Sequence, residues 1–285
     1  MNNNIQNAYF IGHMGLGDVI NYIGAIRYLS KFYNLIYILC FRGYKDNLKM
    51  IFNNLNVDII TTENDDFGNF LTNINNDNDI IVSGCWNAVR PSKITNTYLL
   101  EDISSLQKNN DNDYTVPWSF IKGLYNDINL SLTVYYEYFH IDTFEESLKI
   151  YDKVKNYNIV FLHFYASSGQ SAYPTNEWSW IFNDDYLIID PNKNHYTEEK
   201  DSIKFNLCNE LLNLPFLYYL DIILNSSQLY VIDSSFGALI HLLKKINRVK
   251  GRVIIYDRHY PNKTQYTPIP LFFGESTEFK KYILS

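Results

Sequence analysis

The stretch GHMGLGDVINYIGAIRYLSK, residues 12–31, decides how the first part of this chain folds. It follows an apolar run over residues 8–11 that is typical of a buried strand. Its glycines, Gly15 and Gly17 among them, indicate a sharp turn with room for a ligand, because glycine has no side chain. Asp18 then opens an amphipathic helix, and the first N–H groups of a helix have no partner within it. A strand, a turn and a helix in this order predict an α/β unit.

The same alternation of short apolar runs and amphipathic segments extends over most of the chain. It implies right-handed crossovers and a mostly parallel sheet in each of two halves. The expected strands are residues 8–11, 35–40, 57–61, 80–82, 159–164, 186–189, 229–232 and 252–256, with 130–141 as a further strand that closes the first half. The expected helices are residues 19–33, 46–53, 67–75, 214–224, 237–246 and 275–284.

The predicted fold class is therefore α/β, with two Rossmann-like domains that face each other across a cleft. The first domain is expected over residues 1–145 and the second over residues 146–285, with the terminal helix returning to the first domain. In open parallel sheets, ligands bind beyond the carboxyl ends of the strands. We therefore expect the functional residues to follow strands and to precede helices.

Composition excludes several classes of function. The formal net charge is −7 without a sustained run of Lys or Arg, so nucleic acid is not an expected partner. No apolar run is long enough to cross a bilayer, and the start of the chain lacks the features of a signal peptide. The cysteines, 3 in number, are far apart in the sequence, which disfavours a disulfide framework and a zinc site. These features predict a soluble, cytoplasmic protein.

No metal site is expected either. Two Asp-x-Asp triplets, residues 77–79 and 111–113, lie in runs rich in Asn and Asp, where composition alone produces such triplets. A divalent cation needs several converging oxygens, which these runs do not indicate. The candidates for positive charge at an anionic ligand follow strands of the second half, and solvated loop charges are an equally good alternative for each; they are Arg258, His259, Lys193 and His195.

Two roles are open for Asp18. It can cap its helix and interact with the positive end of the helix dipole, or it can present its carboxylate to a ligand. A dinucleotide fingerprint requires Gly-x-Gly-x-x-Gly, whereas this turn reads Gly-x-x-Gly-x-Gly, and no acidic residue ends the second strand. Binding of a nicotinamide or flavin dinucleotide is therefore disfavoured.

A second motif, VIDSSFGALIHLLKK at residues 231–245, places three polar residues between a strand and a helix. They are Asp233, Ser234 and Ser235. Hydroxyls and free N–H groups at a helix start form a favourable seat for a diphosphate. Capping is the alternative, because Asp and Ser are common residues before a helix.

Two further features accompany this motif. Gly237 and His241 lie four residues apart, on a face of the helix other than its apolar stripe, and a place at the surface or at an interface is the alternative for His241. The loop YASSGQSA, residues 165–172, directly follows the strand expected over residues 159–164. Its small hydroxyl residues suit phosphate oxygens, and an ordinary linker turn is the alternative.

Together these motifs resemble the two-domain GT-B glycosyltransferases, and they are most similar to the heptosyltransferase-like families that use a nucleotide-diphosphate sugar. In those families a Gly-Asp pair after the first strand starts the first helix, and its aspartate is the proposed general base. Asp18 matches that aspartate. Their second half carries an Asp-Ser/Thr-Gly helix start that holds the donor diphosphate, and residues 220–243 are similar to it.

The resemblance implies an inverting, metal-independent glycosyltransferase that moves a sugar from a nucleotide-diphosphate donor to the hydroxyl of a glycan or another acceptor, without a further cofactor. Asp18 is the expected catalytic base, and Gly15 and Gly17 form the substrate turn. The expected donor-binding residues are Ser167, Ser168, Gly169, Asp190, Asp233, Ser234, Ser235, Gly237, His241 and Arg258.

The chain departs from this pattern in ways that keep other functions open. Ser235 stands where the families have glycine, Ala238 stands where they have histidine, and no lysine follows the loop over residues 165–172. One alternative is a binding or scaffold protein that keeps the two-domain fold without catalysis. Another is a Rossmann oxidoreductase or methyltransferase that uses the turn over residues 12–17. The oligomeric state is left open.

Overall fold

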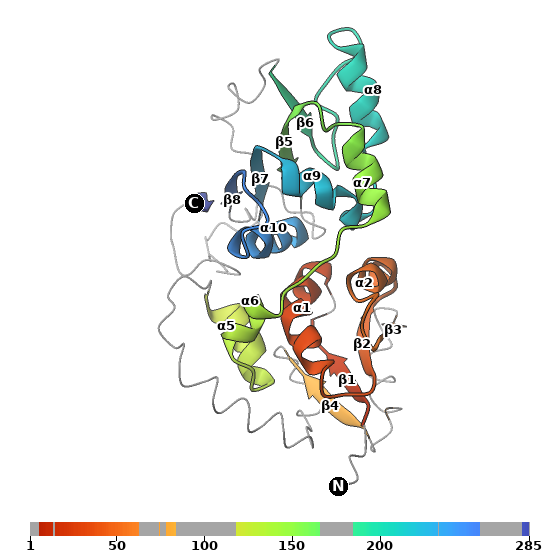
Figure 1. The fold of residues 1–285 in the computed structure, drawn as a ribbon, viewed down its shortest axis with the longest axis vertical. Coiled ribbons are helices and arrows are strands. Elements are labelled where there is room, and N and C mark those ends of the chain that lie inside the picture. The colour runs from red at the N-terminus through yellow and green to blue at the C-terminus, as the bar shows by residue number, and fades with distance from the viewer. Residues whose placement is uncertain are drawn as a thin grey trace, which may run out of the picture. The chain divides into compact units, whose positions relative to one another are not determined.

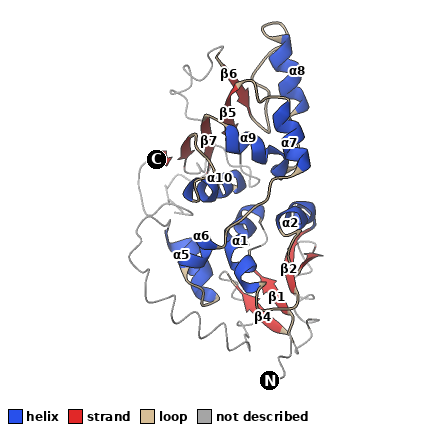
Figure 2. Cartoon of the chain, viewed as in Figure 1, coloured by secondary structure: helices blue, strands red, loops and turns tan. Residues whose placement is uncertain are grey.

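A computed structural model describes residues 6–13, 15–62, 74, 78–83, 118–165, 185–232, 234–256 and 281–284 of the chain. Strands and helices alternate along it (Figure 2). The chain divides into two compact units (Figure 1). Within the described residues, the change from the first unit to the second falls between Ile141 and Asp142. Each unit is built on its own sheet, parallel in the first unit and mostly parallel in the second, so the predicted α/β class is confirmed.

The sheet of the first unit has four parallel strands in the order β3-β2-β1-β4. Its strands are β1 (Ala8–Ile11), β2 (Ile36–Phe41), β3 (Val57–Thr62) and β4 (Asp79–Val82). Its helices are α1 (Leu16–Leu29), the 3-10 turn η1 (Arg42–Tyr44), α2 (Lys45–Ile51), α5 (Trp118–Asp127) and α6 (Leu132–Glu137). The strands match the predicted ones closely. β1, β2 and β4 are short apolar runs that are mostly buried in the parallel sheet, whereas the edge strand β3 is only partly buried.

The strand predicted over residues 130–141 is wrong, because this segment contains α6. The side chain of Ser131 accepts a hydrogen bond from the backbone N–H of Thr133 and so caps the helix. Helix α6 packs against α1 at Gly24, where an added Cβ would lie 2.5 Å from the carbonyl oxygen of Val134. The apolar residues of this segment therefore serve a buried helix face and not a strand.

A buried polar network ties α1 to α5 and α6. The side chain of Asn21 is fully buried. Its Oδ1 accepts a hydrogen bond from Tyr135 Oη at 2.8 Å, and its backbone oxygen accepts one from Tyr125 Oη at 3.0 Å. Its Nδ2 donates to the carbonyl oxygen of Gly17 at 3.0 Å, in the first turn of α1. Because these buried groups satisfy one another, the network holds the start of α1 in place.

The sheet of the second unit has the order β6-β5-β7-β8-β9, with β9 antiparallel to the other strands. Its strands are β5 (Asn158–His163), β6 (Tyr186–Ile189), β7 (Gln228–Ile232), β8 (Arg252–Tyr256) and β9 (Lys281–Leu284). Its helical segments are α7 (Glu145–Asp152), α8 (Ser202–Glu210), η2 (Phe216–Tyr219), α9 (Leu220–Asn225) and α10 (Ser235–Lys245). All four predicted strands of this half are present.

The terminal helix predicted over residues 275–284 is wrong over its last four residues, which form β9. This strand pairs with β8, so that Ile283 lies opposite Ile254. Without β9 the backbone groups of β8 would be exposed along one edge, and pairing satisfies them. The preceding residues 275–280 lie outside the described part of the chain.

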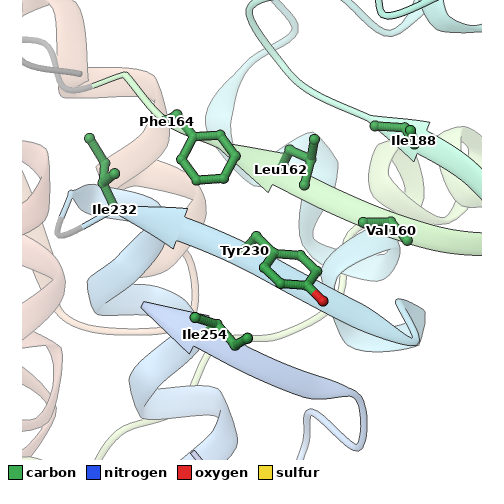
Figure 3. Close-up of a cluster of buried hydrophobic side chains, with 7 residues drawn as sticks. All are labelled: Val160, Leu162, Phe164, Ile188, Tyr230, Ile232 and Ile254. Carbon is green, nitrogen blue, oxygen red and sulfur yellow. The ribbon is translucent and has the colours of Figure 1, made fainter. Parts of the chain in front are cut away.

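One face of the second sheet carries an apolar cluster (Figure 3). Its members are Val160, Leu162, Phe164, Ile188, Tyr230, Ile232 and Ile254. Along β5 these are alternate residues, and successive side chains of a strand point to opposite faces. Phe161 and His163 therefore belong to the other face, where Phe236 of α10 contacts both of their rings.

The described residues were also compared with what a membrane-spanning helix and a reactive cysteine require. Within the described ranges, no helix combines the length and the apolar character that a membrane crossing requires. Cys40 and Cys208 are free and buried, and burial raises the pKa of the Cys40 thiol to about 11.

Candidate functional site

The strand order of the second unit places its switch point between β5 and β7. Chain connections leave neighbouring strands in different directions at such a point, and ligands of open parallel sheets bind there, beyond the carboxyl ends. Strand β5 ends at His163, which lies opposite Val231 of β7. Strand β7 ends at Ile232 and leads into α10. The candidate ligand site of this unit therefore lies between His163 and the start of α10.

Ser234 caps α10. Its backbone is extended, and its Oγ accepts a hydrogen bond from the N–H of Gly237 at 3.5 Å. The same Oγ lies 3.2 Å from the carbonyl oxygen of Ile232 and 3.3 Å from Nδ1 of His163. The residue is buried, with 5% of its surface exposed. Ser235, the first residue of the helix, is half-buried, so it is the more accessible hydroxyl.

Gly237 is needed by the fold itself. A Cβ at this position would lie 2.5 Å from the carbonyl oxygen of Ile232. Helix α10 can therefore turn sharply against the end of β7 because residue 237 has no side chain. This close approach brings the N-terminus of α10, with its partial positive charge, to the carboxyl edge of the sheet.

His163 lies against this helix start. It is 8% exposed, and its ring centre is 4.6 Å from that of Phe236. Burial lowers the pKa of His163 to about 4, and the negative charge of Asp190 opposes this shift. The imidazole is therefore neutral near pH 7. We did not single out His163 from the sequence, although it ends the apolar run IVFLH directly before the loop over residues 165–172.

Asp190 follows the neighbouring strand β6. Its Oδ2 lies 3.0 Å from Nε2 of His195, and its Oδ1 accepts a hydrogen bond from the N–H of Asn192 at 2.9 Å. The side chain of Asp190 is fully enclosed and that of His195 is 9% exposed. His195 is therefore part of a buried pair and not a solvated loop charge, whereas Lys193 is exposed.

His241 does not lie at the surface, which was one alternative for this residue. It is 2% exposed, because residues 236–243 of α10 are buried on every side of the helix and not along one stripe. Burial lowers its pKa to about 3, and the neighbouring charge of Lys245 acts in the same direction. The sequence predicts that α10 is buried along one apolar face, whereas residues on its other faces are buried as well.

The switch point of the first unit lies between β1 and β4. The N–H of Ser83, after β4, donates to the carbonyl oxygen of Ile11, the last residue of β1. The hydroxyl of Tyr22 in α1 donates to the carbonyl oxygen of Ser83 at 3.2 Å. Helix α1 is therefore fastened to the carboxyl ends of both strands, and its first turn follows β1 directly.

Asp18 lies in this first turn as the third residue of α1. The helix starts at Leu16 and its N-cap is Gly15, so it begins earlier than predicted and Asp18 is not the cap residue. The carboxylate instead folds over Gly15, where an added Cβ would lie 2.7 Å from Asp18 Oδ2. Asp18 is half-buried. Its position near the helix start is favourable for a negative charge.

Side chains of the protein itself fill the space beside Gly12 and Gly15. A Cβ at Gly12 would lie 2.6 Å from Cε2 of Tyr22, just as the space beside Gly15 is taken by Asp18. The carbonyl oxygen of Gly17 accepts the hydrogen bond from Asn21. A dinucleotide fingerprint needs such spaces for its pyrophosphate, so this packing adds to the case against dinucleotide binding.

Several predicted site residues lie outside the described part of the chain. They are Ser167, Ser168, Gly169, Asp233, Arg258 and His259. Within the described part, no three His, Cys, Asp or Glu side chains gather as metal ligands would. Asp79, from one of the Asp-x-Asp triplets, is fully buried and accepts a hydrogen bond from Tyr33 Oη at 2.9 Å.

Known proteins offer a limited comparison. No protein-family model matches the chain, and no curated protein matches it. Among solved structures, it is similar to the crystal structure of the glycosyl transferase family 9 from Veillonella parvula DSM 2008. The TM-score is 0.46 at 11% sequence identity, over 84% of this chain and 78% of that chain.

Proposed function

We propose that this protein is a glycosyltransferase that moves a sugar from a nucleotide-diphosphate donor to an acceptor hydroxyl. One observation carries the proposal: the polar residues His163, Ser234 and Ser235 gather at the switch point of the second sheet, at the N-terminus of α10. A helix start at the carboxyl edge of a parallel sheet is a seat for phosphate groups. The resemblance of residues 220–243 to a donor-binding helix start supports the same assignment.

The departing nucleotide diphosphate carries the charge that such a site must stabilise. In the proposed mechanism the free N–H groups at the start of α10 and the hydroxyl of Ser235 bind its oxygens. Preorganised donors of this kind stabilise the developing charge without a metal ion. Ser234 acts indirectly, because its hydroxyl already caps the helix and contacts His163.

Asp18 is the proposed general base. It would accept the proton of the acceptor hydroxyl as that oxygen attacks the anomeric carbon, which inverts the configuration of the sugar. The role fits a half-buried carboxylate that follows a strand, as Asp18 does. General-base catalysis is worth about a hundred- to ten-thousandfold in rate.

A panel of ligands tests the proposal. UDP-, GDP-, ADP- and dTDP-sugars are compared with NAD(P) and S-adenosylmethionine by their effect on the melting temperature. A bound ligand at about a hundredfold excess over its Kd raises the free energy of unfolding by about 3 kcal/mol. Stabilisation by a nucleotide sugar, followed by release of its nucleoside diphosphate when an acceptor is present, is the expected result. Stabilisation by NAD(P) or S-adenosylmethionine alone would contradict the proposal.

A second candidate, a binding protein without catalysis, is favoured by one feature of α10. The position at which the similar families have histidine is the buried Ala238, and His241 is enclosed by the fold. In that case a nucleotide sugar would stabilise the protein, but no nucleoside diphosphate would be released with any acceptor in a broad panel.

A further inference from the structure

His163 is a buried polar side chain whose two ring nitrogens have different surroundings. Nδ1 lies 3.3 Å from Oγ of Ser234. Nε2, on the other side of the ring, has no hydrogen bond to any residue in the described ranges. His163 is buried, with 8% of the residue exposed, and its ring contacts Ser234 Oγ and the ring of Phe236. One nitrogen is thus fixed at the helix start while the other is available.

The hydrogen bonds around Ser234 indicate which nitrogen carries the proton in the free protein. Ser234 Oγ lies within hydrogen-bond distance of the N–H of Gly237, the carbonyl oxygen of Ile232 and Nδ1 of His163. Oγ has one proton, and the carbonyl oxygen can only accept. All three contacts are hydrogen bonds when Ser234 Oγ donates to the carbonyl oxygen of Ile232 and accepts from the backbone N–H of Gly237 and from Nδ1–H of His163. Nδ1 then carries the proton of the neutral ring, and Nε2 is a bare acceptor.

A neutral ring with a bare Nε2 repels phosphate oxygens, whereas an imidazolium donates to them. We propose that His163 takes up one proton from solvent when the diphosphate of the donor binds, and that Nε2–H then donates to a phosphate oxygen while Nδ1–H stays on Ser234. This inference rests on the proposed function. The protonated His163 would supply positive charge to the diphosphate, and no lysine after the strand in the loop over residues 165–172 is present to do so.

The surrounding charges allow this change. Burial keeps the free ring neutral, with a pKa of about 4, and an adjacent anion raises the pKa of a histidine. Asp190, at the end of β6, already acts on His163 in that direction and is itself paired with His195. From α10 the ring is contacted by Ser234 and Phe236, which do not titrate near neutral pH.

Calorimetry measures the proton directly. The nucleotide sugars UDP-glucose, GDP-mannose, ADP-glucose and dTDP-glucose are suitable probes, because their diphosphate is esterified at both ends and does not titrate near neutral pH. Each is titrated into the full-length protein at pH 7 in two buffers that differ in ionisation enthalpy. Uptake approaching one proton for each bound molecule is expected. Binding without proton uptake overturns the inference and leaves the proposed function standing.

Two substitutions of His163 distinguish the role of Nε2 from that of Nδ1. His163→Asn keeps a polar group near Nδ1 and removes the donor at Nε2, so it should abolish proton uptake and weaken binding about ten- to hundredfold. His163→Gln keeps an amide near Nε2 that cannot titrate, so it should bind more tightly than His163→Asn but without proton uptake. Uptake that persists in either variant overturns the inference. If no nucleotide sugar binds the wild-type protein, the inference and the proposed function both fail.

Discussion

The carboxylate of Asp18 occupies the space beside Gly15, with Oδ2 2.7 Å from where a Cβ on Gly15 would lie. Gly15 is the N-cap of α1 and makes no side-chain cap hydrogen bond. A side chain at residue 15 would displace the carboxylate, so the glycine serves the position of Asp18 as much as the bend of the chain. The proposed base is therefore positioned by the first turn of its own helix.

Replacement of Asp18 by asparagine tests its role. Asp18→Asn keeps the size of the side chain but cannot accept a proton, so turnover should fall about a hundred- to ten-thousandfold. The Kd for the nucleotide sugar and the melting temperature should change little. Asp46→Asn is the matched control, because Asp46 is an exposed acidic residue in the first turn of α2. Full activity of Asp18→Asn, measured as release of nucleoside diphosphate, would remove Asp18 from the mechanism.

The buried histidines predict how stability depends on pH. Burial lowers the pKa of His163 to about 4 and that of His241 to about 3, whereas an unfolded histidine titrates near 6.5. Below pH 6.5 the unfolded chain therefore binds more protons than the folded protein, and the free energy of unfolding falls as the pH falls. Each histidine should therefore make the free energy of unfolding about 2 kcal/mol lower at pH 5 than at pH 7.

Variants assign this loss to the two histidines. His241→Leu and His163→Asn should each reduce the difference in unfolding free energy between pH 7 and pH 5, as measured by urea unfolding at both values. The double variant should reduce it further, because the two side chains titrate separately. An unchanged difference in both single variants would show that the loss arises from carboxyl groups instead.

Much of the fold could be predicted because its strands are short apolar runs between turns. The limits of β1 and β8 agree with the predicted ranges, since burial on both faces of a parallel sheet requires such runs. Helix α8 was missed because its surface is mostly polar and it buries little more than Cys208. Its start is fixed by Asp201, whose side chain accepts from the N–H of Lys204.

The candidate site was predictable in part. Ser234 and Asp18 were identified because polar residues between a strand and a helix are conspicuous in the sequence. Ser234 caps α10, which is the alternative that the sequence left open, and it also contacts His163. Asp18 does not cap α1, because the N-cap of that helix is Gly15. His163 was missed because a single histidine at the end of an apolar strand has no local pattern. Its place in the candidate site follows from the strand order, which sets β5 beside β7 and so brings His163 next to Ser234.

The contact between Tyr33 and Asp79 predicts a structural role for a residue of an Asp-x-Asp triplet. Tyr33 Oη donates to Asp79 Oδ2 at 2.9 Å, and both residues are buried. Tyr33→Phe removes the donor and should lower the free energy of unfolding by about 1–3 kcal/mol. Tyr37→Phe is the control, because Tyr37 stacks on Tyr9 and a phenylalanine keeps that contact. Equal melting temperatures of the two variants would contradict this assignment.

The close contact between α1 and α6 predicts that an alanine at Gly24 destabilises the protein, whereas an alanine at an uncrowded glycine of another helix stabilises it. At Gly24 an added Cβ would lie 2.5 Å from the carbonyl oxygen of Val134 and 2.9 Å from that of Tyr135, and backbone atoms cannot move aside as a side chain can. Gly24→Ala should therefore force the helices apart and lower the free energy of unfolding by about 1–3 kcal/mol.

Gly123 in α5 is the matched control. Among the described residues no atom lies within 4 Å of its added Cβ. Gly123→Ala should stabilise the protein by up to about 1 kcal/mol, because alanine favours a helix over glycine. Thermal unfolding followed by circular dichroism separates the two variants, since 1 kcal/mol corresponds to about 2–4 °C for a chain of this size. If Gly24→Ala also raised the melting temperature, α6 would not pack against α1 as closely as the structure has it, and the buried network of Asn21 would lose its support.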